Sequence, residues 1–407
     1  MSALTPFRAL RPAPAVASRV ASVPYDVVST DEARALAADN SLSFLHVTRA
    51  EIDLPADVSP YDARVYDKAV ENLAALTAAA PMVRDDEPCL YVYRLRMGTH
   101  EQVGVAGCFS LDEYDQGLIK KHEKTRRDKE DDRTRHLTAL GAQTGIVFLT
   151  YRAESSIDSL VAQVCQGTPL YDVTAADEVT HTVWQVKPGA AARPGTDAFV
   201  RAFADVPALY IADGHHRAAS ASRARAELAG RASAGTFVAV AIPDAQAQIL
   251  PYNRVVKDLG GRSAMEILDA IEARVAVRPG LASRGRHGEV SMFLDGAWHT
   301  IVLPPAPPGT SRADALDVEV LQREVLGPVL GIGDPRTDKR IDFVGGIRGT
   351  AELERLVSSG RAAIAFALAP VSVADLMAIA DEGGIMPPKS TWFEPKLRDG
   401  LFVHVLD

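Results

Sequence analysis

The sequence predicts an α+β protein with two domains. Its 407 residues suit two domains at about 100–200 residues each, and 47% hydrophobic with 24% charged residues is the composition of ordinary globular domains. Short apolar runs that end in turn residues alternate with amphipathic stretches along the whole chain, which predicts both strands and helices. Two pairs of these runs are joined by short turns, as in antiparallel hairpins, so a mixed sheet is expected. We place the domains at residues 1–260 and 261–407.

In the first domain, the helix that follows Ser29 has the clearest start signal. Ser29 and Glu32 have the spacing of a capping box, in which each side chain accepts a hydrogen bond from the backbone N–H of the other residue. This helix should run to about residue 38. Run length and alternation predict the other elements: a strand at 43–48, a helix at 61–80, paired strands at 89–97 and 102–110, a polar helix within 120–136, a buried strand at 145–151, a strand at 208–212 followed by a helix to about 228, and a strand at 237–242.

The second domain continues the alternation of helices and strands. The expected elements are a helix at 264–272, paired strands at 290–294 and 299–303, helices at 316–326 and 351–357, a strand at 362–368, a helix at 371–379 and a final strand at 401–406. The Pro-rich stretch at 304–309 reads as a linker or a surface loop. An α/β region is therefore expected here.

Charge, hydropathy and cysteine content exclude several classes of protein. The 44 Lys+Arg against 53 Asp+Glu give a net charge of −9, and affinity for a phosphate backbone needs a clustered excess of basic residues, so no nucleic-acid partner is expected. No run of about 18 apolar residues occurs, so no membrane span is expected. Three cysteines without CxxC spacing predict neither a disulfide framework nor a zinc site. A reducing, cytoplasmic setting follows as the default.

The sharpest local motif joins the strand at 208–212 to the next helix through Asp213, Gly214, His215, His216 and Arg217. A helix entered through a glycine turn offers free backbone N–H groups and the positive end of its dipole, so the motif predicts an anion site. Arginine can fork two hydrogen bonds onto phosphate or carboxylate, and the histidines can move protons. We expect His216 and Arg217 on an exposed pocket wall. The alternative is a plain helix start with Asp213 as its cap.

A second candidate lies in the charged segment 120–136. Mixed charge of this density is typical of a solvated helix with i, i+4 ion pairs, which is one interpretation. The other rests on Glu123, Lys124 and Thr125, which bring a carboxylate, an ammonium and a hydroxyl together. Phosphoryl-transfer sites use these groups to hold a polyanion and its magnesium.

Two further positions complete the candidate set. Lys389, Ser390 and Thr391 follow a rigid Pro-Pro entry, and a lysine with adjacent hydroxyls can bind phosphate. Asp26 lies in the short segment Pro24-Tyr25-Asp26, where it is either a general base or a turn acceptor.

Six segments carry a resemblance that spans almost all of the chain. They are PYDVVS at 24–29, EKTRRDKEDDRTRHLTAL at 123–140 with VFLTYR after it, IADGHHRAASA at 211–221, LPYNRVV at 250–256, LDVEVLQREVLGPVLGI at 316–332 and MPPKSTWFEPKLRDGLFVH at 386–404. Taken together and in this order, they resemble a conserved bacterial and archaeal family known as a domain of unknown function.

The segment 211–221 also resembles the signature of the ParB/sulfiredoxin-like superfamily, whose glycine turn and helix N-terminus bind nucleotide or pyrophosphoryl groups. The resemblance implies a mixed-sheet core of that type with a large insertion, and a C-terminal α/β region that contributes the loop at 389–391. Sulfiredoxins have a cysteine where this chain has His215, so their thiolate chemistry is not expected. ParB-type clamps add a helix-turn-helix and a basic face, and neither is recognisable here. Members with Gly-His-His-Arg look like free L-serine kinases.

This resemblance implies a phosphotransferase that acts on the hydroxyl of a small amino acid, namely L-serine, with ATP, ADP or pyrophosphate as donor. The expected catalytic residues are Asp213, His215 and His216, with Glu123 or Asp26 as the base; the expected phosphate-binding residues are Gly214, Arg217, Lys124, Thr125, Lys389, Ser390 and Thr391. Asp213 would also bind Mg²⁺. The alternatives are a phosphatase for O-phosphoserine, a nucleotide hydrolase and a non-catalytic nucleotide-binding regulator. The oligomeric state is left open, with a homodimer as one option.

Overall fold

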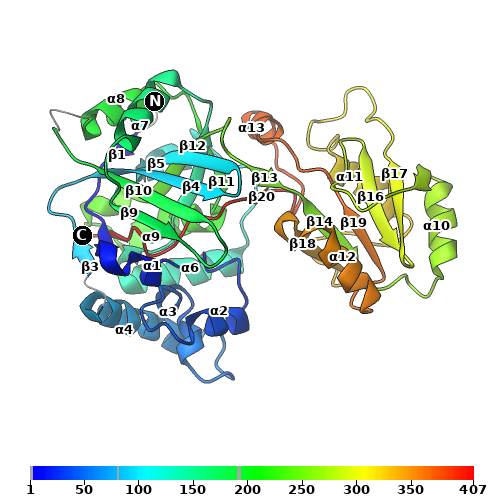
Figure 1. Ribbon diagram of the computed structural model, residues 1–407, viewed down its shortest axis with the longest axis horizontal. Helices are drawn as coiled ribbons and strands as arrows, with labels where there is room; N and C mark the ends of the chain where they lie inside the picture. The colour runs from blue at the N-terminus through cyan, green and yellow to red at the C-terminus, as the bar shows by residue number, and fades with distance from the viewer. Residues whose placement is uncertain (1–2, 80–81, 190–193) are drawn as a thin grey trace. The chain divides into compact units, whose positions relative to one another are not determined.

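The computed structural model describes residues 3–79, 82–189 and 194–407, and the chain divides into two compact units (Figure 1). The first unit comprises Met1–Ala247 together with Pro395–Asp407, and the second comprises Gln248–Glu394. The last segment of the chain therefore returns to the first unit. The predicted boundary lay at residue 260, so the structure assigns 248–260 and 395–407 differently.

A mixed sheet of nine strands forms the centre of the first unit. The order is β6-β11-β8-β12-β5-β4-β10-β9, and β1 pairs with β5. β12 runs parallel to β8 and β11 parallel to β6, while the other neighbours are antiparallel. The strands are β1 (Leu4–Thr5), β4 (Leu90–Met97), β5 (His100–Ser110), β6 (Ile119–Lys120), β8 (Val147–Tyr151), β9 (Tyr171–Thr174), β10 (Thr180–Val186), β11 (Leu209–Asp213) and β12 (Thr236–Pro243).

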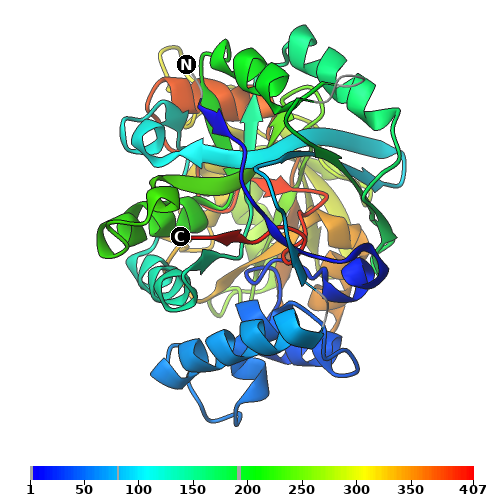
Figure 2. The ribbon, with the colours of Figure 1, turned by 90° about the vertical axis from the view of Figure 1, so that its left-hand side faces the viewer.

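Helices cover this sheet, and the helices α2–α4, drawn in blue, form a layer beside it (Figure 2). α6 packs against α9 and α4, and α7 packs against α8 and strands β4, β5 and β10. The helices are α1 (Ala17–Val20), α2 (Thr30–Ala37), α3 (Leu45–Thr48), α4 (Ala63–Ala79), α5 (Leu111–Asp115), α6 (Arg127–Leu140), α7 (Ser155–Cys165), α8 (Thr196–Ala204) and α9 (His215–Glu227), with short 3₁₀ turns η1 (Pro14–Val16), η2 (Ala50–Asp53) and η3 (Ala232–Gly235).

Two small two-stranded sheets tie the ends of the chain into the first unit. β2 (Leu10–Pro12) pairs with β3 (Met82–Arg84), and β21 (His404–Val405) pairs with β7 (Ala142–Gln143). The backbones of Ser22 and Asp399 also bridge to each other, with both N–H···O distances at 3.0 Å. These pairings bring the residues after Pro395 next to the N-terminal segment.

The second unit is built on an antiparallel sheet of six strands, in the order β15-β17-β16-β19-β14-β18. Its elements are β13 (Ile249–Leu250), β14 (Tyr252–Val256), α10 (Ala264–Glu272), β15 (Ala276–Pro279), β16 (Glu289–Leu294), β17 (Ala297–Val302), α11 (Asp317–Leu321), the π-helical turn η4 (Gln322–Leu326), β18 (Ile341–Gly345), the 3₁₀ turn η5 (Gly346–Arg348), α12 (Gly349–Ser358), β19 (Ile364–Ala367), α13 (Val373–Asp381) and β20 (Trp392–Phe393). β13 pairs with β20, so the two ends of this unit meet.

The α+β class with a large mixed sheet is confirmed, and most predicted elements are present. The capping box of Ser29 and Glu32 is formed at the start of α2, with N–H···O distances of 2.8 and 3.2 Å. The predicted helix at 61–80 is α4, although residue 80 lies outside the described residues.

Three predicted elements differ from the structure. The strand at 43–48 is wrong, because Leu45–Thr48 is the helix α3 and buries Leu45 and Val47 in two separate apolar clusters. Apolar residues at short spacing fit a helical turn as well as a strand, so the pattern did not decide between them. The helix at 316–326 is divided into α11 and a π-helical turn, and the final strand shrinks to His404–Val405. In the described part of the chain, no helix has the length and apolarity needed to traverse a bilayer.

Candidate functional site

The turn between β11 and α9 is built around Gly214. Its backbone has φ 98° and ψ 28°, a left-handed conformation that glycine adopts without steric cost. A Cβ here would lie 3.1 Å from Arg217 Nε and 3.4 Å from Val147 Cα. Gly214 itself occupies the N-cap of α9, and no side chain caps the helix, so the alternative of Asp213 as the cap is wrong. The first backbone N–H groups of α9 are therefore not taken up by a capping side chain.

Asp213, the last residue of β11, faces two cations. Its Oδ2 lies 3.1 Å from Lys396 Nζ, and its Oδ1 lies 3.6 Å from Arg217 Nη2. Burial raises the pKa of Asp213, but the charges of Lys396 and Arg217 outweigh burial and hold the pKa below its ordinary value. Asp213 is thus ionised at neutral pH, although only 29% of its side-chain surface is exposed to water.

Arg217 is buried, and the expectation that it lies on an exposed wall is wrong. Its side chain is 7% exposed, and Nη1 donates to the carbonyl of Ile146. Nη2 lies 3.6 Å from Asp26 Oδ2, the same distance that separates it from Asp213. The exposed position of Arg217 was predicted from the residues of the motif alone. These residues do not show that other parts of the chain fold over the arginine. Its guanidinium joins the two carboxylates within one unit.

The two histidines at the start of α9 hold the segment that follows β6. His216 Nε2 accepts a hydrogen bond from the backbone N–H of Arg126 at 3.0 Å, and His215 Nε2 accepts one from the N–H of His122 at 3.4 Å. Because burial penalises the charged ring and the neighbouring His122 adds to this, the pKa of His215 lies well below its ordinary value. His215 is therefore neutral at pH 7, with its proton on Nδ1 when Nε2 accepts.

Glu123 lies on the other side of the His215 ring. Its Oε2 is 3.9 Å from His215 Nδ1, and the Glu123 side chain is 50% exposed. The ring of His122 packs edge-on against that of His215, with centroids 4.4 Å apart. The structure thus brings Asp26, Glu123, Asp213 and the histidines of the motif to one end of the sheet, around β11.

His122, Glu123 and His215 also form a group that could hold a metal ion. One ligand atom from each lies within 4.8 Å of the others. Both ring nitrogens of His122 lack a hydrogen-bond partner among the described residues. A metal on His215 Nδ1 would, however, put the ring proton on Nε2. Nε2 could then no longer accept the hydrogen bond from the backbone N–H of His122. The hydrogen bond at Nε2 therefore favours a proton-carrying histidine here over a ligand.

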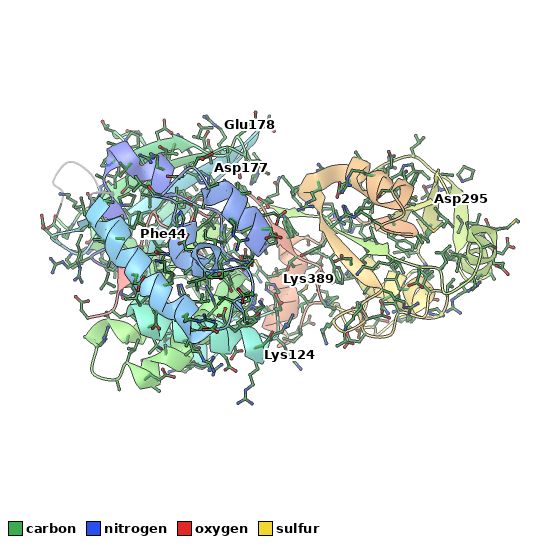
Figure 3. All side chains as sticks on the ribbon, turned by 90° about the horizontal axis from the view of Figure 1, so that it is seen from below. Phe44, Lys124, Asp177, Glu178, Asp295 and Lys389 are labelled. Atoms are coloured by element: carbon green, nitrogen blue, oxygen red, sulfur yellow. The ribbon has the colours of Figure 1, made fainter. Side chains whose placement is uncertain are left out.

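Lys124 and Thr125 follow Glu123 in the connection between β6 and α6. Lys124 is exposed (Figure 3), and the hydroxyl of Thr125 donates to the carboxylate of Glu130. Both residues therefore lie on the segment that the two histidines hold. Their role in phosphate binding stays a prediction.

Lys389, Ser390 and Thr391 belong to the second unit and not to the unit that holds Asp213. Lys389 has a left-handed backbone with φ 53°, as have Glu178 and Asp295 among the non-glycine residues described (Figure 3). The hydroxyl of Ser390 donates to the carbonyl of Pro387 at 2.7 Å, and the carbonyls of Pro388 and Lys389 accept from Arg254. The loop is thus held in place within its own unit, and its role in phosphate binding stays a prediction.

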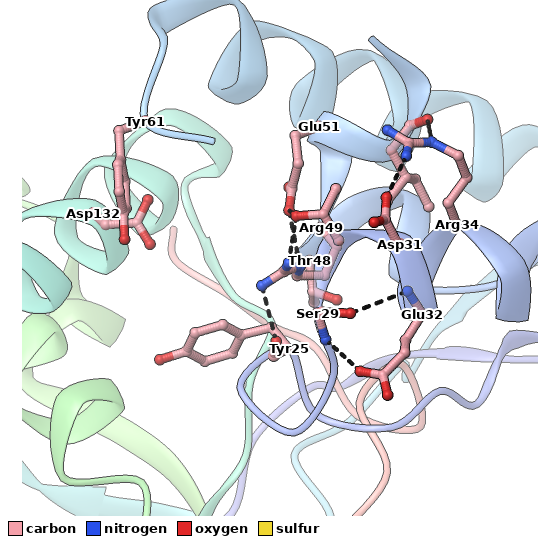
Figure 4. Close-up of polar contacts among 12 residues, drawn as sticks. Tyr25, Ser29, Asp31, Glu32, Arg34, Thr48, Arg49, Glu51, Tyr61 and Asp132 are labelled. Carbon is pink, nitrogen blue, oxygen red and sulfur yellow. Dashed lines mark hydrogen bonds and ion pairs between the residues drawn. The ribbon is translucent and has the colours of Figure 1, made fainter. Parts of the chain in front are cut away.

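Sequence reasoning missed Lys396, Asp399 and Arg133. Lys396 and Asp399 lie in the segment 386–404 that carried part of the family resemblance, but only its lysine-serine-threonine part was singled out. Asp399 is 1% exposed and lies close to Arg217, and Arg133 of α6 lies over the ring of Tyr25 at 4.2 Å. Arg49 fixes Tyr25 in turn by donating to its carbonyl at 3.2 Å, as the dashed line in Figure 4 marks.

Comparison with known proteins gives one family and several distant structures. The structures include a conserved hypothetical protein from Pyrococcus furiosus (14% identity, TM-score 0.35, covering 74% of this chain and 95% of that one). Others are a free serine kinase in complex with AMP (14%, 0.35, 74% and 91%) and SbnI with a C-terminal truncation from Staphylococcus aureus (12%, 0.39, 74% and 87%). A comparison with curated proteins found no match. The family model described as "Protein of unknown function (DUF1015)" matches residues 4–321, and the chain therefore belongs to the DUF1015 family.

Proposed function

We propose that this protein is a phosphotransferase that moves a phosphoryl group between a nucleotide or pyrophosphate and the hydroxyl of a small amino acid, namely free L-serine. The observation that carries the proposal is the turn at Gly214. It places an uncapped helix N-terminus beside the cation Lys396 and the carboxylates Asp213 and Glu123. Anion-binding amides, a cation and a proton acceptor within one site are what phosphoryl transfer requires.

The donor phosphates bind at the start of α9. The N–H groups of its first turn and the positive end of the helix dipole attract an anion, and His216 and Lys396 supply further donors. Lys124 and the loop of Lys389, Ser390 and Thr391 remain proposed phosphate contacts by residue type. Arg217 contributes a fixed positive charge between Asp26 and Asp213. In a site shielded from water, such fixed charges stabilise the transferring group by several kcal/mol.

Glu123 is the proposed base for the acceptor hydroxyl. Asp26 faces the guanidinium of Arg217 at 3.6 Å, whereas Glu123 faces the neutral ring of His215 at 3.9 Å. A neighbouring positive charge favours the ionised form of a carboxylate and makes it a poorer proton acceptor. In the forward direction Glu123 takes the proton of the hydroxyl while the hydroxyl oxygen bonds to phosphorus, and the bond between this phosphorus and the bridging oxygen of the donor breaks, so the donor leaves one phosphoryl group shorter. In the reverse direction the phosphoryl group returns to that oxygen and Glu123 gives the proton back to the hydroxyl.

Asp213 remains the proposed ligand for Mg²⁺. Carboxylate oxygens are ligands that Mg²⁺ prefers, and it binds through one or two of them plus phosphate oxygens and waters. Asp213 already pairs with Lys396, so this pair has to open before the carboxylate can coordinate an ion. When bound, magnesium would neutralise charge on the donor phosphates.

The test is phosphorus NMR on the full chain with Mg²⁺, L-serine and, in turn, ATP, ADP and pyrophosphate. We expect O-phosphoserine to form with at least one donor. Nucleotide binding without turnover for every donor would instead identify a non-catalytic nucleotide-binding regulator. Release of phosphate from O-phosphoserine, or from the nucleotide alone, would identify a hydrolase.

A further inference from the structure

A small cavity lies behind Arg217 in the first unit. Its volume is about 40 Å³, and its polar wall includes Tyr25, Arg133, Gly145, Arg217 and Asp399. A water molecule needs roughly 10–15 Å³ of such a cavity, so there is room for about three groups of the size of a water molecule. It is therefore too small for a nucleotide but of the right size for one end of a small molecule.

Some atoms of the charged groups that line this cavity lack hydrogen bonds in the described part of the chain, although Arg217 Nη2 forms ion pairs with Asp26 and Asp213 across 3.6 Å. Arg217 Nε and Nη2 and both carboxylate oxygens of Asp399 are buried and make no hydrogen bond of ordinary distance and angle with the described residues, although the backbone amide of Ile146 lies close enough to lower the pKa of Asp399. Arg217 is 9% exposed and Asp399 is 1% exposed. A buried polar group without a hydrogen-bond partner destabilises the folded state, and more so when it is charged. Such groups facing a cavity indicate that something polar fills it.

Gly145 keeps the space between these two side chains open. A Cβ at this position would lie 2.9 Å from Arg217 Cδ and 3.9 Å from Asp399 Oδ1. An alanine would therefore press on Arg217 and make ordinary van der Waals contact with Asp399. The glycine thus preserves room where the guanidinium and the carboxylate face each other.

The geometry of Arg217 indicates a carboxylate or phosphate as its guest. Nε and Nη2 form one edge of the guanidinium, and the two parallel N–H groups of this edge are those that a carboxylate or phosphate accepts together. Nη1 is on the other edge and already donates to the Ile146 carbonyl. The Nε–Nη2 edge makes no hydrogen bond with the described residues, and Asp26 and Asp213 lie 3.6 Å from Nη2, so this edge can still take a two-oxygen acceptor.

Asp399 decides between a plain anion and a zwitterion. Arg133, the second guanidinium of the wall, is already paired with Asp132 at 2.8 Å. Burial raises the pKa of Asp399 to about 7, so near neutral pH an isolated anion would meet a partly ionised carboxylate there, with Asp26 only 3.6 Å from Arg217 as well. A guest that carries an ammonium beside its carboxylate satisfies both Arg217 and Asp399 and adds no net charge. An α-amino acid has this pair of groups.

We propose that this cavity binds the α-carboxylate and α-ammonium of the amino-acid acceptor, with the carboxylate on the Nε–Nη2 edge of Arg217 and the ammonium on Asp399. The inference rests on the proposed function and assigns its acceptor subsite. Arg217 also lies 3.6 Å from Asp213, the last residue before the turn at Gly214, so the cavity and the candidate site share this arginine. Asp399 is then a residue that determines specificity for amino acids.

The first experiment uses the wild-type full chain and needs no variant. Calorimetry measures binding of L-serine, of 3-hydroxypropionate, which lacks the ammonium, of ethanolamine, which lacks the carboxylate, and of inorganic phosphate. We expect each of the last three to bind at least tenfold more weakly than L-serine. Equal binding of L-serine and 3-hydroxypropionate, tighter binding of phosphate, or no binding of L-serine would overturn the proposal and leave a cavity that holds water or a simple anion.

The second experiment compares two variants with a matched control. Asp399→Asn keeps the shape of the side chain but removes its charge, and Gly145→Ala fills the space; each should weaken binding of L-serine at least tenfold. Asp172→Asn, on β9 and bonded to Thr182 at 2.9 Å, should bind as the wild type does. Unfolding curves confirm that each variant is folded, and the analogue series on the wild type stands even where a variant does not fold.

These measurements separate the subsite from the reaction. Formation of O-phosphoserine together with unchanged L-serine affinity in Asp399→Asn would refute the subsite and leave the phosphotransferase intact. Tight binding of L-serine that Asp399→Asn abolishes, without any phosphoryl transfer, would support the subsite and refute the phosphotransferase.

Discussion

Lys396 Nζ lies 3.1 Å from Asp213 Oδ2, although the two residues are 183 positions apart in the sequence. Asp213 ends the strand β11, and Lys396 is the second residue of the segment that returns to the first unit after the second unit is complete. The Lys396 side chain is 15% exposed, so the contact is largely shielded from water. This ion pair is therefore both a link that closes the first unit and part of the candidate site.

Lys396→Met should remove this link. The carboxylate of Asp213 then keeps only Arg217 as a cation, so we expect a loss of about 1–3 kcal/mol in the free energy of unfolding and a drop in kcat of about tenfold or more. Denaturant unfolding and steady-state kinetics measure the two effects. In the double variant Asp213→Asn/Lys396→Met, part of the lost stability should return, because no lone charge is left. Strict additivity of the two substitutions would show that the pair does not couple.

His216 and Arg217 should differ in what they contribute to stability. Arg217 is buried between two carboxylates, so Arg217→Ala should lower the unfolding free energy by about 2–4 kcal/mol. His216 is half-buried and bonds one backbone N–H, so His216→Ala should cost about 1 kcal/mol or less while it reduces phosphoryl transfer. Thermal and denaturant unfolding of the two variants decide this. Equal losses of stability would contradict the buried position of the arginine.

Gly214→Ala tests the close approach at the turn. The substitution has to adopt φ 98° and brings a Cβ to 3.1 Å from Arg217 Nε, so both strain and contact oppose it. Gly230 has a similar φ of 105° with nothing within 4 Å of its Cβ position, which makes Gly230→Ala the matched control. The control should lose about 1–2 kcal/mol of stability from backbone strain alone. Gly214→Ala should lose more stability than the control and should also lose activity. An equal loss of stability in both variants would show that the contact between the new Cβ and Arg217 has no effect.

Asp399 should make stability depend on pH in an unusual direction. Burial raises its pKa from 3.8 to about 7, with Asp26 adding to the rise while Arg217 and the Ile146 amide oppose it. Between pH 4 and 7 the folded state therefore holds a proton that the unfolded state has lost, so stability falls as pH rises, by at most about 1.4 kcal/mol per pH unit.

Asp399→Asn should remove this contribution. The difference in unfolding free energy, variant minus wild type, should increase between pH 4 and 7 and stay level above pH 7. Other buried groups, such as His136, whose burial lowers its pKa to about 3, cancel in the difference. Chemical denaturation at a series of pH values gives the curve. A flat difference across this range would mean that Asp399 is ionised throughout.

Removal of magnesium should stop phosphoryl transfer without unfolding the protein. The proposed ligand Asp213 is paired with Lys396 when no ion is bound, so no uncompensated charge results. We expect EDTA to abolish formation of O-phosphoserine and Mg²⁺ to restore it. The free energy of unfolding should change by less than about 1 kcal/mol, which is close to the effect of about ±0.5 kcal/mol that a surface substitution has. Full activity in EDTA would refute the magnesium role.

The sequence was most informative where a short stretch determines its own structure. The strand β11, the turn at Gly214 and helix α9 follow one another directly, so apolar run, glycine and alanine-rich stretch together predicted all three. The capping box at Ser29 is local in the same sense. By contrast, SFLHVT at 43–48 forms a helical turn because of what Leu45 and Val47 pack against, and no local pattern records that.

The candidate site was predicted only in part for the same reason. Asp213, His215 and Arg217 were visible because they are adjacent, whereas Lys396 and Asp399 enter the site through pairing between distant segments. Charge pairs across such separations leave no spacing signal in a single sequence. The burial of Arg217 likewise depends on the residues around Tyr25 and Ile146 that fold over it.

The return of residues 395–407 to the first unit has a consequence for biosynthesis. A ribosome makes the chain from its N-terminus, so Lys396 and Asp399 emerge only after every residue of the second unit has been translated. A nascent or prematurely terminated polypeptide carries the glycine turn, both histidines and Arg217, but it lacks Lys396, the second cation of Asp213, and the buried acid Asp399. Such an intermediate cannot assemble the site until the second unit and the segment after it have been translated.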